Sequence, residues 1–155
     1  MKKFYQKGIS VIEILLVVAI IGILSLIVFP QFSKIKENQI FKNTIEDVVS
    51  TLHSAQSQSL ASVDSFEYGV HFESDEIIIF KGNIFSESAL DNKIIKIISP
   101  ANISNVTLGG VSSSSGDVYF ERLSGVPNKV GTITVSVPST SKIITIYSTG
   151  AVGVD

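Results

Sequence analysis

An unbroken apolar run near the N-terminus constrains this chain more than any other feature of its sequence. From Ile9 to Phe29 the only ionisable residue is Glu13. As a helix that rises roughly 1.5 Å per residue, this run spans about 30 Å, which matches the hydrocarbon core of a bilayer. The sequence therefore predicts a transmembrane helix over residues 9–29.

The charges that flank the run predict its orientation. Lys2, Lys3 and Lys7 precede it, so the positive-inside tendency places the N-terminus in the cytoplasm and the rest of the chain outside. A cleaved secretory signal is a weaker interpretation, because the run is longer than usual and residues 28–32 offer no small-x-small cleavage site. A buried helix of a soluble protein is also weaker, because a helix that is apolar on all faces needs a larger protein to cover it.

The lone acid in the run needs an explanation. A charged side chain at the centre of a membrane helix costs roughly 2.5 to 3.5 kcal/mol on insertion scales, so it usually has a partner or a function. A cut after Gly8 would create an α-amino group on Ile9, which is four residues before Glu13. This amine could reach Glu13 within its own helix or the Glu13 of a neighbouring subunit. The sequence leaves both options open.

The N-terminal segment KGISVIEILL, residues 7–16, closely resembles the signal of type IV prepilins and type II secretion pseudopilins. The resemblance implies that a prepilin peptidase removes the leader after Gly8 and N-methylates Ile9, although most of these proteins carry phenylalanine at that position. It also implies that Glu13 forms an ion pair with a subunit amine during assembly on an inner-membrane platform. Gly22 and Pro30 fall where such helices commonly have a glycine and a proline, and we expect Pro30 to kink the helix.

Beyond the membrane segment, the sequence predicts an α+β fold, with an amphipathic helix packed on an antiparallel β-sheet domain. Apolar residues recur at helical spacing up to about residue 63. Short strand-like segments follow, whereas the stretch from Gly109 to Gly116 reads as a mobile surface loop. The expected parts are a leader at 1–8, a transmembrane or filament-core helix at 9–29, its amphipathic continuation at 30–63, and an exported β-rich domain at 64–155. The expected apolar face consists of Phe41, Ile45, Val48, Val49, Leu52, Ala55 and Leu60, and the expected strands, forming one meander, are 68–72, 76–81, 93–98, 117–123, 132–137 and 142–148.

The C-terminal half has a recurring order of strands and glycines: Phe120, Gly125, the alternating strand at 132–137, the segment Ile143–Tyr147, Gly150 and Val152. This order is similar to the C-terminal part of the GspH/FimT-type minor pseudopilins and minor pilins. The pattern of strands and glycines is degenerate, so the likeness is sharp only over residues 7–30.

Catalytic, metal and nucleic-acid chemistry find little support in the sequence. The chain has no cysteine, and His53 and His71 belong to no metal-binding motif, so we expect no catalytic, cofactor or metal site. The acidic residues at 73, 75 and 76 lack the spacing of a calcium loop. The charges sum to −2 without a basic cluster, so no nucleic-acid partner is expected.

The sequence thus predicts a pilin-like structural subunit, a minor component of a type II secretion pseudopilus or a type IV pilus. Its expected partners are prepilin peptidase, other pilin or pseudopilin subunits, the assembly platform and membrane lipid, and its expected location is the inner membrane and then the filament. A competence pseudopilin that takes up DNA, a membrane-anchored binding domain that never polymerises, and an anchored enzyme remain as alternatives.

Overall fold

A computed structural model describes residues 9–155, with the side chains of residues 26–31 outside the description. Helix α1 extends from Val11 to Leu60, and the chain divides into two compact units, Met1–Lys36 and Glu37–Asp155. Each unit is described by itself. Gly8 and the rest of the expected leader lie outside the described residues.

The transmembrane part of the prediction is not confirmed. Among the side chains that the structure describes, no helix combines the length and the apolar character that crossing a membrane requires. The described side chains of the apolar run stop at Ser25, and a span needs about 20 consecutive apolar residues. The expected kink at Pro30 also falls within residues 26–31.

The amphipathic character of the second half of α1 is confirmed. In the unit Glu37–Asp155 its apolar face packs on the β domain, where Val48, Leu52 and Ala55 have no exposed surface. Ile45 and Val49 are partly buried against the same core, whereas Leu60, the last residue of the helix, is 45% exposed. The buried face also includes three hydroxyl residues that the apolar pattern does not include: Thr44, Thr51 and Ser59.

The helix ends three residues before the predicted boundary at 63. After Leu60 the chain enters a single turn of 3-10 helix, η1, from Val63 to Ser65. Ser62, Asp64 and Ser65 all have a positive φ, between 49° and 63°, which no residue of an α-helix adopts. These left-handed residues reverse the chain into the first strand.

The β domain contains nine strands in two antiparallel sheets, so the expected single meander of six strands is wrong. The first sheet has the order β3-β2-β1-β6 and the second the order β5-β4-β7-β8-β9. The strands are β1 (Tyr68–Phe72), β2 (Glu76–Lys81), β3 (Lys93–Lys96), β4 (Asn102–Leu108), β5 (Val111–Ser113), β6 (Gly116–Phe120), β7 (Gly131–Val137), β8 (Thr140–Ile146) and β9 (Val152–Val154).

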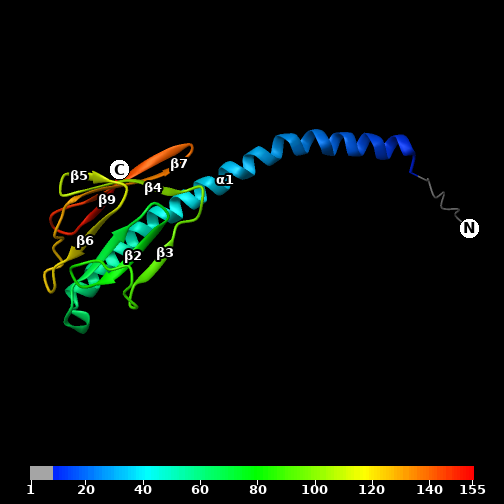
Figure 1. Ribbon diagram of the computed structural model, residues 1–155. Coiled ribbons are helices and arrows are strands. Elements are labelled where there is room, and N and C mark those ends of the chain that lie inside the picture. Colours follow the sequence, from blue (N-terminus) through cyan, green and yellow to red (C-terminus); the bar gives the residue numbers. More distant parts are fainter. Residues whose placement is uncertain (1–8) are drawn as a thin grey trace, which may run out of the picture. The chain divides into compact units, whose positions relative to one another are not determined.

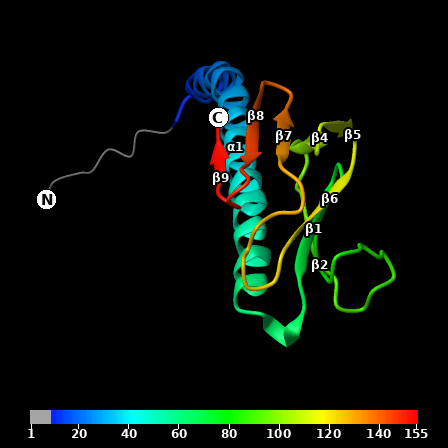
Figure 2. The same cartoon turned by 90° about the vertical axis from the view of Figure 1, so that its left-hand side faces the viewer.

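One hydrophobic core joins both sheets to the second half of α1, and Figures 1 and 2 show the strands gathered along this part of the helix. Side chains along a strand point alternately to the two faces of the sheet, and one of these faces packs into the core. In β7, for example, Ile133 and Val135 are fully buried while Thr132 and Thr134 remain partly exposed on the other face. The coarse prediction of an α+β fold with antiparallel sheets is therefore confirmed.

The segment predicted as a mobile loop, Gly109 to Gly116, is instead a hairpin followed by the start of a strand. Leu108 pairs with Val111 across a two-residue turn made of Gly109 and Gly110, whose φ values are +60° and +82°. Positive φ at both turn residues matches the right-handed twist of the flanking strands, and glycine adopts it without a steric penalty.

Candidate assembly site at the start of the N-terminal helix

The two residues that the sequence pairs, Ile9 and Glu13, lie together at the start of α1. Both side chains line a hollow of about 290 Å³ whose other walls are Ile14, Val17 and Val18. Glu13, Val17 and their neighbours Ile14 and Val18 lie on one face of α1, because residues three or four apart share a helix face. Ile9 lies two residues before the helix and borders the same hollow, so the structure brings Ile9 and Glu13 to one site.

The start of α1 has a feature that sequence reasoning missed, since Ser10 lies directly before the first helical residue, Val11. The carbonyl oxygen of Ser10 accepts hydrogen bonds from the backbone N–H groups of Glu13, at 3.0 Å, and Ile14, at 3.3 Å. Ser10 therefore precedes the helix as its N-cap, and the spacing Ser-x-x-Glu is that of a capping box. The signal was present in the sequence as a serine three residues before the glutamate.

The position of Glu13 in the first helical turn is electrostatically favourable. The free N–H groups of a helix start carry a partial positive charge that stabilises a nearby carboxylate by roughly 0.3 to 1 kcal/mol. Within residues 9–155, Glu13 forms no ion pair with a basic side chain. The helix start thus tolerates the carboxylate, and the carboxylate keeps its capacity to bind a cation.

The apolar side chains around Glu13 are exposed on every face of the helix. From Ile9 to Leu24 each large apolar side chain is at least 47% exposed, the value for Val17, and Val11 reaches 75%. Apolar area on this scale is normally removed from water by lipid or by another protein surface. Residues 9–24 thus form an apolar surface that their own unit leaves exposed.

The two expected kink positions remain untested. Gly22 lies inside α1, and a Cβ atom placed on it would have no neighbour within 4 Å. Pro30 also lies inside α1, but its side chain is among those not described.

Gly125 and Gly150, which belong to the C-terminal pattern described above, both lie against Gln56 near the end of α1. The side-chain amide of Gln56 donates a hydrogen bond to the carbonyl oxygen of Gly125, and Gly150 packs against the same amide. Phe120 is fully buried in the core. Packing thus accounts for these residues in this chain.

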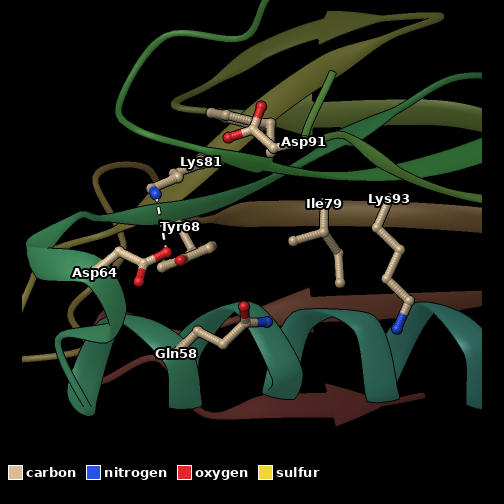
Figure 3. Close-up of a pocket in the computed structure, with 8 residues that line it drawn as sticks. Gln58, Asp64, Tyr68, Ile79, Lys81, Asp91 and Lys93 are labelled. Atoms are coloured by element: carbon tan, nitrogen blue, oxygen red, sulfur yellow. Dashed lines mark hydrogen bonds and ion pairs between the residues drawn. The ribbon is translucent and has the colours of Figure 1, made fainter. Parts of the chain in front are cut away.

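A second cavity, also of about 290 Å³, lies between the end of α1 and strands β1 to β3 (Figure 3). Lys81 Nζ donates a hydrogen bond of 2.9 Å to Asp64 Oδ2, which lowers the pKa of Asp64 and raises that of Lys81. Burial is the main cause that raises the pKa of the Tyr68 hydroxyl. The charges of Lys81 and Asp64 thus neutralise each other at the edge of this cavity.

The two histidines lie apart from this cavity and from each other. His53 is on the exposed face of α1, whereas the His71 ring stacks on Phe85 with ring centroids 3.9 Å apart. His71 Nε2 lies 3.4 Å from Glu73 Oε1. Over the described residues, no cluster of three or more histidine and carboxylate side chains is arranged to hold a metal ion.

Comparison with known proteins identifies no relative. No family model, no curated protein and no solved structure matches this chain.

Proposed function

We propose that this protein is a pilin-like structural subunit, cut after Gly8 by a prepilin peptidase and assembled as a minor component of a type II secretion pseudopilus or a type IV pilus. The apolar half of α1 anchors the precursor in the inner membrane, with the N-terminus inside. The same half then enters the filament core, and the β domain lies outside the membrane.

The observation that carries this proposal is the contrast between the two halves of α1. The second half has one buried face, which packs on its own domain, whereas the described apolar residues before Ser25 are exposed all round. A helix with one apolar face, like the second half of α1, can bury that face within its own chain. A helix that is apolar on all faces, like the first half, needs lipid, sister helices or both to cover it.

The carboxylate of Glu13 can respond when the helix moves from the membrane into the filament core. A lone charge in an apolar surrounding is costly, but a charge that meets an amine and forms hydrogen bonds with it recovers much of that cost. The α-amino group of Ile9 exists only after the leader is removed. Cleavage thus supplies the cation, from the same chain or from a neighbour, and only a processed subunit can neutralise Glu13.

A DNA-uptake function receives less support from the surface of the domain. Lys129 Nζ lies 3.7 Å from Asp117 Oδ2, so this basic group is already partnered. The guanidinium of Arg122 donates a hydrogen bond to the carbonyl oxygen of Ser65 and thereby fixes a turn. Phosphate recognition needs clustered basic groups that are free to bind.

The proposal is tested by co-expressing the chain with a prepilin peptidase and measuring the mass of the product. We expect loss of residues 1–8 and one added methyl group on Ile9. A Gly8→Leu variant should keep the leader, because prepilins are cut after a glycine. An intact leader on the unaltered chain, in cells that process a known prepilin, would refute the proposal.

A second measurement separates assembly from simple anchoring. If the processed chain cross-links to other pilin-like subunits through cysteines placed in residues 12–24, the helix is part of a filament core. A chain that is processed but never forms these cross-links is a membrane-anchored binding domain.

A further inference from the structure

Strand β3 forms one edge of the first sheet. Among the described residues β2 is its only strand neighbour, and Figure 1 shows it at the margin of the domain. Lys93, Ile94 and Lys96 are exposed, whereas Ile95 is partly buried against the core. The strand is thus held by the packing of Ile95 on the core and by its hydrogen bonds to β2.

The backbone register shows which groups of β3 face the open side. Ile97 N donates a hydrogen bond of 2.8 Å to Asp75 O, which continues the register that pairs Ile95 with Ile77. In an antiparallel pair, residues bonded to the neighbour alternate with residues whose N–H and C=O groups point away. Ile94 and Lys96 therefore present their backbone groups to the open edge.

The hydrogen bonds of β2 support the same assignment. Glu76 lies opposite Lys96, and its carbonyl oxygen accepts a hydrogen bond of 2.9 Å from Glu73 N, next to β1. The backbone of Glu76 is therefore turned away from β3, as expected for a pair of residues that are not bonded to each other.

The residues that face the open side, Ile94 and Lys96, offer one apolar and one basic side chain on the same face of the sheet. Ile94 is 53% exposed, and Ile98, just beyond the strand, is 67% exposed. Within residues 9–155, neither Lys93 nor Lys96 forms an ion pair. Lysines on an edge strand can serve to prevent pairing with another chain, so the edge needs a test that separates this role from recognition.

Strand β2 shows what kind of segment complements β3. It places Glu76 opposite Lys96 and Ile78 opposite Ile94. Residues directly opposite each other in an antiparallel pair share one face, so the same order would suit the vacant side. A second copy of β3 is a poorer match, because its only charged side chains are lysines.

We propose that the open edge of β3 binds an extended segment of a partner protein, which adds a strand to the first sheet. This segment carries a carboxylate opposite Lys96 and, two residues further along, a branched apolar side chain opposite Ile94. The backbone groups of Ile94 and Lys96 supply the hydrogen bonds, and the two side chains supply the selectivity. This inference does not depend on the proposed assembly function.

The test uses the full chain in detergent micelles and a short, end-blocked peptide of sequence Thr-Glu-Thr-Val-Thr. Amide hydrogen exchange is followed by NMR. In the free protein the amides of Ile94 and Lys96 should exchange quickly, and that of Ile97 slowly. Saturating peptide should slow the first two by about tenfold or more, since they become bonded. A control peptide with lysine in place of glutamate should leave the exchange of both amides unchanged.

Two variants make the test specific. Ile94→Pro removes an N–H that faces the open edge, so it should abolish peptide binding while the amide of Ile97 stays protected, because proline is tolerated at such a position. Lys96→Glu should reverse the preference toward the lysine peptide. The proposal is overturned if neither peptide slows exchange, if both do so equally, or if the two amides are already protected by self-association of the free chain.

Discussion

The side-chain amide of Gln56, on α1, donates a hydrogen bond of 3.1 Å to the carbonyl oxygen of Gly125, in the loop after β6. Gly150, with a φ of +82°, completes this junction, because any Cβ on it would lie 2.6 Å from the same carbonyl oxygen and would overlap the Gln56 amide. The end of the helix, the loop after β6 and the turn before β9 are thus joined at one point.

Gly150→Ala should therefore destabilise the protein far more than Gly110→Ala. Both glycines have a φ of +82°, so both substitutions cost about 1 kcal/mol in backbone strain. A Cβ on Gly110 meets nothing within 4 Å, whereas one on Gly150 adds a steric clash that typically costs about 1 to 3 kcal/mol. Denaturant unfolding of the two variants measures the difference, and equal losses would contradict this account of the junction.

Ser59→Ala should cost about 1 to 3 kcal/mol, because it leaves a buried donor without a partner. The Ser59 hydroxyl is fully buried and accepts a hydrogen bond of 2.8 Å from the N–H of Tyr68, the first residue of β1. Ser57→Ala, on the exposed side of the same helix turn, is the matched control and should be nearly neutral. Thermal unfolding of both variants checks the prediction, which fails if the two melting temperatures agree.

Local sequence patterns were enough to predict several elements of the fold. The β-branched and aromatic residues of 68–72 and 76–81 gave the bounds of β1 and β2 correctly, and the helical spacing of apolar residues from Phe41 to Ala55 gave the packed face of α1. Periodicity failed where a turn decides the structure. The segment 109–116 is too polar to look like a strand, yet Gly109 and Gly110 close a hairpin that pairs Leu108 with Val111.

The arrangement of the strands could not be read from their individual patterns. Strand β1 pairs with β6, which lies more than 40 residues further along the chain, and such long-range pairing leaves no local signal. The candidate site is the opposite case. Ile9 and Glu13 are only four residues apart in the sequence, so both can border one hollow at the start of α1 without any long-range contact.

The ion pair between Lys81 and Asp64 should show in the titration of Asp64. The hydrogen bond from Lys81 lowers the pKa of Asp64, so the folded chain favours the carboxylate. The resulting stabilisation is complete above about pH 4, the ordinary value for aspartate, and is lost as the pH falls through the lower folded value. Lys81→Met should return the pKa of Asp64 to its ordinary range, as measured by carboxyl carbon NMR. Lys93→Met, in the same cavity, should leave that pKa unchanged, and a shift of equal size in both variants would contradict the assignment.

Glu13→Gln separates two roles that the sequence suggests for this residue, which are a capping box with Ser10 and pairing with an amine. Glutamine suits the third helical position of a capping box as glutamate does, so the helix start should be preserved and circular dichroism should show unchanged helix content.

The charge, however, is lost. Removing one partner of a buried ion pair typically costs about 3 to 5 kcal/mol, so incorporation into filaments should fall at least tenfold. Glu46→Gln, at an exposed position further along α1, is the matched control and should assemble normally. If Glu13→Gln assembled as well as Glu46→Gln, capping alone would account for the glutamate and the pairing role would be wrong.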